Sequence, residues 1–310
     1  MLTKADRITG GLIGLLVGDA LGVPYEFHAA KEIPPLAQIE MEPPIGFARS
    51  HRTTPIGTWS DDGAQALCLL ASLLDCNCLD PDDLGRRLVD WYDRGYMAVD
   101  GKVFDVGIHT ARVVHEISRG MPVLAAGALG NQARGNGSLM RVLPLVLWHR
   151  GSDESLVADA HLQSRVTHGD SYCQICCALY CLWARRMLEQ SSDPWQQATV
   201  KLRQIYTIEP SFLDILDWAI RPDDEPDGRG GGYVIDCLRS ARMVMSQSSY
   251  ELVVKRAVAL GDDTDTTACV AGGVAGLRDG IGAITTRWRE LLRGMEIVNP
   301  LLDLLVQQHF

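Results

Sequence analysis

Apolar residues recur along most of this chain with the spacing of helices. No segment alternates apolar and polar residues as a half-buried strand does, and no strand–helix–strand rhythm is present. Helices are expected over about 62–75, 106–119, 139–148 (bent or interrupted at Pro144), 153–166, 171–190, 194–206, 211–219, 233–246, 249–259, 266–278 and 283–293. A further helix, capped by Asp80-Pro81-Asp82-Asp83, carries Leu84, Leu88, Trp91 and Tyr92. Because no linker divides these segments, the pattern predicts an all-α protein with a single domain over residues 1–310.

Small residues recur at every fourth position in two apolar segments, which gives each predicted helix a smooth face. The first set is Gly10, Gly14, Gly18 and Gly22, and the second is Ala268, Gly272, Gly276 and Gly280. Each glycine costs a helix about 1 kcal/mol relative to alanine, so two such sets indicate that close packing is required. We expect the two helices to pack in the core and to hold Asp19, Glu26 and the acidic turn at 261–266 near one another.

The segment 27–58 has no helical pattern. Pro34, Pro35, Pro43, Pro44 and Pro55 exclude a continuous helix. A long irregular segment in a compact domain is usually functional or disordered, so we expect a lid over the acidic site.

Two acidic turns each precede an apolar segment. One is Thr58-Trp59-Ser60-Asp61-Asp62-Gly63, and the other is Gly261-Asp262-Asp263-Thr264-Asp265-Thr266. As separate helix caps, the turns would account for one or two carboxylates each. If the turns meet, four or five carboxylates share one site, and their repulsion calls for divalent cations. Ligands that are all carboxylate and hydroxyl oxygens suit Mg²⁺ or Mn²⁺, so the sequence leaves two caps and one metal site as alternatives.

Composition and charge reduce the number of functional classes that the protein could belong to. Hydrophobic residues make up 46% of the 310 residues, which is enough for a sizeable core, and the net charge of −10 disfavours nucleic-acid binding. The apolar segment at 8–17 is rich in glycine and continues into Asp19, so neither a signal peptide nor a segment of transmembrane length is expected.

The chain has nine cysteines, an odd number that disfavours a complete disulfide framework. Cys173, Cys176, Cys177 and Cys181 share one face of a predicted helix, and Cys76 and Cys78 could complete a zinc site. Buried free thiols are the alternative and are more typical of a helical stripe. We therefore expect a soluble protein in the reducing cytoplasm.

Three connections carry glycine or polar motifs. The segment 133–138 precedes a predicted helix, so its N–H groups could cradle an anion. The others are Thr167-His168-Gly169-Asp170 and the glycine-rich segment 221–233. Taken singly, each is better explained by a helix cap or a flexible loop.

Five motifs in order resemble those of the ADP-ribosylglycohydrolase family, which includes the dinitrogenase reductase-activating glycohydrolases. They are Gly18-Asp19-Ala20-Leu21-Gly22, Trp59-Ser60-Asp61-Asp62, Gly135-Asn136-Gly137-Ser138-Leu139-Met140-Arg141, Thr167-His168 and Gly261-Asp262-Asp263-Thr264-Asp265-Thr266. The resemblance covers about residues 7–293. It implies an all-α orthogonal bundle with a dinuclear Mg²⁺ or Mn²⁺ site.

The resemblance also implies roles for individual residues. The matching metal ligands are Ser60, Asp61, Asp62, Asp263, Asp265 and Thr266, with serine where the family more often has threonine. The implied catalytic carboxylates are Asp61, Asp105 and Glu26. The implied substrate-binding residues are Gly135, Asn136, Gly137, Ser138 and Arg141 for the diphosphate and ribose, and His168 and Tyr172 for the adenosine. Ile108 stands where the bacterial enzymes often have asparagine, a departure at the acceptor side of the substrate.

The implied reaction is hydrolysis of the N- or O-glycosidic bond between ADP-ribose and a protein side chain. All six ligand positions are occupied by oxygen-bearing residues, which favours an active enzyme over a family member that only binds ADP-ribose. A hydrolase of a free derivative, such as O-acetyl-ADP-ribose, is a further alternative. The expected partners are an ADP-ribosylated protein or such a derivative, with no nucleic acid and no membrane.

Overall fold

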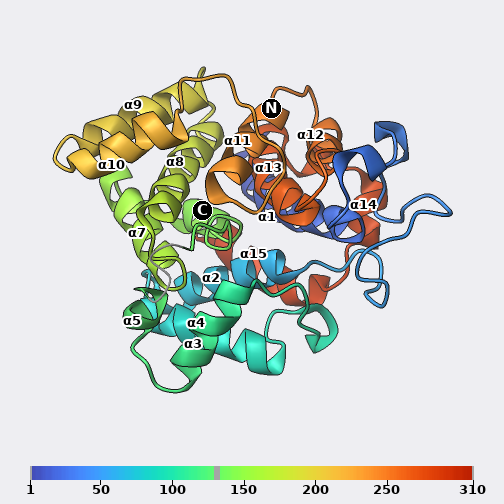
Figure 1. Ribbon diagram of the computed structural model, residues 1–310, viewed down its shortest axis with the longest axis horizontal. Helices are drawn as coiled ribbons and strands as arrows, with labels where there is room; N and C mark the ends of the chain where they lie inside the picture. The colour runs from blue at the N-terminus through green and yellow to red at the C-terminus, as the bar shows by residue number, and fades with distance from the viewer. Residues whose placement is uncertain (1, 129–132, 309–310) are drawn as a thin grey trace.

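The protein is an assembly of α-helices, shown in Figure 1 as a computed structural model that describes residues 2–128 and 133–308. The helices are α1 (Lys4–Gly22), α2 (Asp61–Cys76), α3 (Pro81–Arg94), α4 (Ile108–Ser118), α5 (Val123–Gly127), α6 (Leu143–Trp148), α7 (Asp153–Arg165), α8 (Ser171–Leu188), α9 (Pro194–Tyr206), α10 (Pro210–Asp214), α11 (Val234–Val244), α12 (Tyr250–Val258), α13 (Thr264–Asp279), α14 (Thr286–Leu291) and α15 (Met295–Gln307). Within the described ranges, the only β interactions are isolated bridges, Ala29 to Gly261 and Gly135 to Tyr233. The predicted all-α class is confirmed.

The two sets of small residues face each other where α1 packs along α13. A Cβ atom added to Gly18 would lie 2.1 Å from the carbonyl oxygen of Ala268, and one added to Gly14 would lie 2.6 Å from that of Gly272. One added to Gly10 would lie 2.5 Å from that of Gly276. The backbones of the two helices are therefore in direct contact, as the glycine spacing predicts.

The other helices surround this pair. Helices α2 and α12 pack against it, α11 and α8 contact α13, and α7, α8 and α9 form a second group to one side (Figure 1). The four cysteines of α8 are buried and free, and no group of candidate metal ligands among the described residues includes a cysteine. The stripe therefore consists of buried thiols that pack as small apolar side chains.

Some predicted boundaries are wrong. Helix α6 begins at Leu143 rather than near 139, because Pro144 takes the first turn, where its missing N–H costs no hydrogen bond. Helix α13 begins at Thr264, two residues earlier than predicted. The pattern missed the short helix α5 and also α15, which contains Pro300.

The segment Lys4–Tyr25 is long and apolar enough to cross a membrane by length and composition, contrary to the expectation from its glycines. However, 94% of its most apolar window is buried inside the protein. Packing against α13 therefore accounts for its apolar character.

The segment 27–58 is irregular, as predicted, but much of it is held in place. Ile39 and Met41 are fully buried. The Glu40 carboxylate accepts hydrogen bonds from Lys255 Nζ at 3.0 Å, from Arg287 at 2.9 Å and from Trp288 Nε1 at 2.6 Å. These contacts fix the segment to α12 and α14 on one side of the molecule (Figure 1). Its movement as a lid stays a prediction.

The α1–α13 contact can be tested with Gly18→Ala. In an unobstructed helix this change would raise the free energy of unfolding by about 0.5–1 kcal/mol. Here the added methyl group meets the backbone of α13, so we expect a loss of about 1–3 kcal/mol in denaturant unfolding. Gly282→Ala is the matched control, because a Cβ there meets nothing within 4 Å. A Gly18→Ala protein more stable than the wild type would contradict the contact.

Candidate active site

The two acidic turns meet at the N-termini of α2 and α13. Asp19 of α1 ties α2 in place, because its carboxylate accepts hydrogen bonds from the N–H of Ser60 at 2.9 Å and of Gly63 at 2.8 Å. A Cβ on Gly22 would lie 2.3 Å from the Cα of Asp265, so α1 also contacts the start of α13. Thr266 Oγ1 donates to Asp62 Oδ1 at 3.3 Å across the junction. The sequence left separate caps and one shared site as alternatives, and the structure shows that the two turns meet.

The residues at this junction could hold a metal ion. Carboxylate oxygens of Glu26, Asp263 and Asp265 all lie within 4.8 Å of one another. The Oδ2 atoms of Asp62 and Asp265 are buried and accept no hydrogen bond. Buried carboxylate oxygens without donors are costly, and a hard divalent cation would satisfy them. The donors present are carboxylates and hydroxyls, so they fit such an ion.

Burial controls the protonation of this cluster. It is the main cause that raises the pKa values of Asp61, Asp62 and Asp265 well above the ordinary range, and neighbouring carboxylates add to the effect. Burial likewise raises the pKa of Glu26 to about 10, with further contributions from Asp105, Asp263 and Asp61. Without a compensating cation, the folded protein therefore keeps protons on several of these groups.

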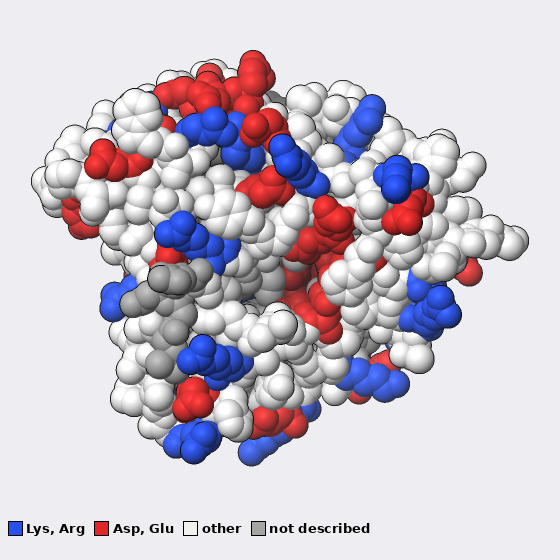
Figure 2. All heavy atoms as spheres, viewed as in Figure 1, with Lys and Arg blue, Asp and Glu red and all other residues white. Residues whose placement is uncertain are grey.

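The cluster lies at the bottom of a cleft with a volume of about 830 Å³. Figure 2 shows a hollow near the centre of the viewed face with acidic side chains on its wall. The cleft is lined by Glu26, Phe27, Asp61, Asp62, Asp105, Val106, Gly107, Ile108, His109, Thr110, Gly135, Asn136, Gly137, Met140, His168, Gly232, Asp262, Asp263 and Thr266. Most of the predicted site residues are thus brought together in one cavity.

The glycine-rich segment at 135–137 lines the cleft next to Asp263. The Asn136 amide donates to Asp263 Oδ2 at 2.7 Å, so this predicted substrate contact also orients a predicted metal ligand. A Cβ on Gly137 would lie 2.8 Å from His168 Cε1. Only glycine therefore lets the backbone approach the buried imidazole of His168.

Three predicted substrate-binding residues do not line this cleft. Ser138 is fully buried, with its Oγ 2.9 Å from Ser164 Oγ, because the turn at 137–141 points it inward. Arg141 is also fully buried and donates to Gln65 Oε1 at 3.0 Å, and Gln65 donates to Asp61 Oδ2 at 3.0 Å. Arg141 thus acts on the site through Gln65. These two positions are corrections to the sequence-based expectation.

Tyr172 is the third. Its ring packs under the Arg134 guanidinium, 3.6 Å from the ring centre, and lines a neighbouring cleft of about 410 Å³ together with Tyr233. Gly135, which lines the acidic cleft, forms an isolated bridge with Tyr233, which lines the neighbouring one. Tyr172 therefore lies at the neighbouring cleft, whereas His168 lines the acidic cleft.

The structure also places residues at the site that the motifs did not indicate. His51 Nε2 lies 2.6 Å from Glu26 Oε2, and His109 Nε2 lies 2.7 Å from the carbonyl oxygen of Thr167. Phe27 lies on the rim and is 69% exposed. An isolated histidine in an irregular segment gives no pattern, so the sequence carried no signal for His51 beyond its place in the predicted lid.

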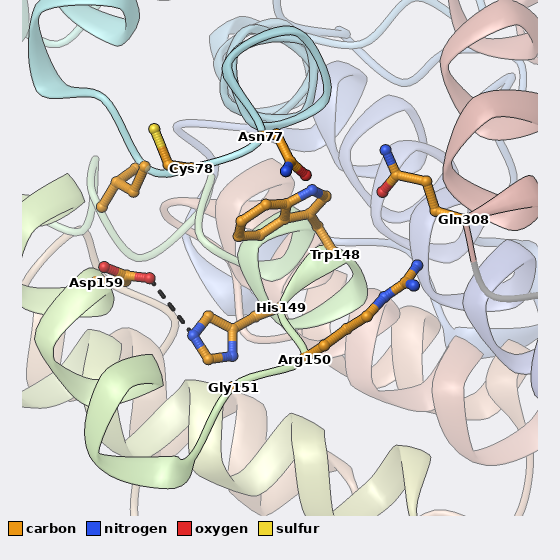
Figure 3. A pocket seen from close by; sticks show the side chains of 9 residues that line it. Asn77, Cys78, Trp148, His149, Arg150, Gly151, Asp159 and Gln308 are labelled. Carbon is orange, nitrogen blue, oxygen red and sulfur yellow. Dashed lines mark ion pairs between the residues drawn. The ribbon is translucent and has the colours of Figure 1, made fainter.

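A second cavity, of about 510 Å³, lies at the opposite end of α2, which spans about 24 Å for its sixteen residues. Trp148, Arg150 and Gln308 line it (Figure 3), and His149 Nε2 lies 3.5 Å from Asp159 Oδ2. None of the predicted site residues reaches this cavity. The acidic cleft is therefore the candidate active site.

Comparison with known proteins decides the family. The model of the ADP-ribosylglycohydrolases matches residues 1–309. The chain belongs to this family. Its relatives include the ADP-ribosylarginine hydrolase Tri1 of Pseudomonas putida, which is 28% identical over 92% of this chain and 74% of that protein. They also include the ADP-ribosyl-[dinitrogen reductase] glycohydrolase of Rhodospirillum rubrum, 25% identical over 91% of this chain and 89% of that one.

A solved structure agrees with this family. It is described as an ADP-ribosylglycohydrolase-related protein complex and covers 99% of both chains with a TM-score of 0.79 and 28% identity. The predicted family, the all-α fold and the enzyme class, an ADP-ribosylglycohydrolase, are confirmed.

Metal binding can be tested through the pH dependence of the melting temperature. In chelator, groups such as Asp19 and Glu26 have raised folded-state pKa values of about 7 and about 10. Their stabilising contribution is complete below about pH 4 and is lost as the pH rises through these folded-state values, so the melting temperature should fall from about pH 4 to about pH 10. Mg²⁺ or Mn²⁺ requires deprotonated ligands, so the gain in melting temperature on adding metal should grow over the same range.

Asp61→Ala is the control for this experiment, because it removes one proposed ligand. A hundredfold excess of metal over its dissociation constant stabilises the wild type by about 2.7 kcal/mol, and most of this gain should vanish in the variant. Equal gains in the two proteins would place the cations elsewhere.

Proposed function

We propose that the protein hydrolyses the glycosidic bond between ADP-ribose and an arginine side chain of a target protein. The observation that carries the proposal is the convergence, in one cleft of about 830 Å³, of carboxylates from both acidic turns with the glycine-rich segment at 135–137. The cleft thus offers carboxylates that could bind cations and, beside them, a glycine-rich backbone that the rest of a nucleotide could approach closely.

Two Mg²⁺ or Mn²⁺ ions are the proposed cofactors, held by Ser60, Asp61, Asp62, Asp263, Asp265 and Thr266. When bound, such ions supply Lewis acidity, which orients ribose hydroxyls and lowers the pKa of water. The unpaired oxygens of Asp62 and Asp265 support this assignment. The Ser60 hydroxyl, 3.3 Å from the N–H of Asp62, keeps the ligand type that threonine would provide.

The proposed catalytic groups differ in exposure. The side chain of Asp105 is 20% exposed beside the rim, whereas that of Glu26 is only 5% exposed and faces the acidic cluster. Departure at the anomeric carbon builds positive charge on the sugar, which nearby carboxylates stabilise. We assign Asp105 to the acceptor side of the bond, and Glu26 or Asp61 to removal of the proton from the attacking water.

Charge at the mouth of the cleft supports an arginine acceptor. Asp262 is exposed at the rim, next to Asp105 and Asp263. A cationic guanidinium is favoured there over a neutral serine hydroxyl. The name of the Pseudomonas putida relative, an ADP-ribosylarginine hydrolase, agrees with this choice. We also propose a cytoplasmic location, which the nine free thiols support.

A substrate panel tests the proposal. With Mg²⁺ or Mn²⁺, the protein should cleave an arginine-linked ADP-ribosyl peptide faster than a serine-linked one or O-acetyl-ADP-ribose. Asp265→Asn should lower kcat at least a hundredfold, because a buried ligand is lost, while Asp262→Asn, at an exposed side chain, should stay within about fivefold of the wild type. Faster cleavage of O-acetyl-ADP-ribose would overturn the proposal that the substrate is a protein. If none of the three substrates were cleaved, the protein would be one that only binds ADP-ribose.

Substitution of Asp105 tests whether this residue acts in the chemical step or in substrate binding. Asp105→Asn keeps the size of the side chain but removes its charge, so we expect kcat to fall about a hundredfold with KM within about threefold. Steady-state kinetics on the preferred substrate measure both. An unchanged kcat with a raised KM would instead make Asp105 a binding residue.

A further inference from the structure

The irregular segment 27–58 places one side chain among the catalytic carboxylates. His51 Nε2 lies 2.6 Å from Glu26 Oε2 and 3.9 Å from Asp105 Oδ1. The three side chains are 16%, 5% and 20% exposed, so water competes only weakly with these contacts. One imidazole nitrogen therefore stands between the two carboxylates assigned to catalysis outside the metal ligands.

Ser50, the residue before His51, binds the backbone of Glu26. The N–H of Ser50 donates to the carbonyl oxygen of Pro24 at 2.9 Å, and the Ser50 hydroxyl donates to the carbonyl oxygen of Glu26. Residues 50 and 51 thus hold both the main chain and the side chain of Glu26. A segment that served only as a cover would have no need of this double attachment.

The backbone at this point is held in an uncommon conformation. Phe27, His51 and Asp105 have φ values of 62°, 47° and 56°, in the left-handed region that residues other than glycine rarely adopt. The rings of Phe27 and Phe104 flank the imidazole, with centres at 5.7 Å and 5.0 Å. Such conformations persist only where the surroundings enforce them, and they cluster at functional sites.

We propose that His51 is a positioning residue that fixes the Glu26 carboxylate between Asp105 and the acidic cluster. The inference rests on the hydrolase function proposed above. Glu26 also lies within 4.8 Å of Asp263 and Asp265, so the contact with His51 determines how it is presented to them. The segment 27–58 then contributes a residue to the active site.

The contact survives a change in proton position. The separation of 2.6 Å between His51 Nε2 and Glu26 Oε2 is that of a hydrogen bond, so one proton lies between the two atoms. Either the imidazole N–H donates to the carboxylate, or the protonated carboxyl donates to the imidazole. In both states the hydrogen bond holds the same geometry, which suits a group that must exchange a proton during turnover.

The test is steady-state hydrolysis of the arginine-linked substrate by His51→Ala and His51→Gln. We expect His51→Ala to lower kcat ten- to hundredfold with KM within about twofold, because a misplaced catalytic group slows chemistry more than binding. Glutamine keeps an N–H donor, so His51→Gln should recover to within about fivefold of the wild type. His28→Ala is the matched control: its Nδ1 lies 2.9 Å from the Glu26 carbonyl oxygen and touches no carboxylate.

A double variant shows whether His51 acts through Glu26. If it does, His51→Ala should cause no further loss of kcat in a Glu26→Gln background. Additive losses, or a wild-type kcat in His51→Ala, would overturn the positioning role. So would loss of kcat in His51→Gln together with a lowered melting temperature in both variants, which marks a structural role. An inactive wild type would overturn the hydrolase function as well, whereas an active wild type with an unaffected His51→Ala overturns this inference alone.

Discussion

Backbone contact between α1 and α13 is the constraint on which the rest of the structure depends. Helices with ordinary side chains lie 8–10 Å apart, but here glycines face carbonyl oxygens at separations that no Cβ could occupy. The same close approach brings Gly22 against Asp265 and lets Asp19 reach the start of α2. Two acidic turns separated by about two hundred residues in sequence thereby converge at one point. The glycines lower the stability of the two helices, but they allow the close approach that brings the turns together.

The meeting of the two acidic turns places several carboxylates close together, and their negative charge must be stabilised. The N-termini of α2 and α13 point their positive dipole ends at the carboxylates, which offsets part of the repulsion. Burial, with the remaining repulsion added to it, raises the pKa values of Asp61, Asp62 and Asp265. The buried charge is thus unfavourable in the bare protein, and a bound divalent cation would compensate it.

Neutral and cationic side chains behind the carboxylates keep them in place. Asn136 holds Asp263, Gln65 holds Asp61 with Arg141 behind it, and His51 holds Glu26. Each partner comes from a different part of the chain. Because Asn136 and Asp263, and likewise Arg141 and Gln65, come from distant segments, these contacts form only when the whole bundle is folded.

The sequence by itself determined most of the helices and the pairing of the two glycine faces, because each has a periodic signature. It left the two acidic turns either as separate caps or as one shared site, and only the packing of α1, α2 and α13 brings them together. It did not determine which side of the turn at 137–141 faces the cleft, so Ser138 and Arg141 are buried where substrate contacts were expected. It also gave no reason to choose His51 from an irregular segment. Only the tertiary structure decides such positions, because a side chain in a turn or loop is directed by packing against distant elements and not by its neighbours in the chain.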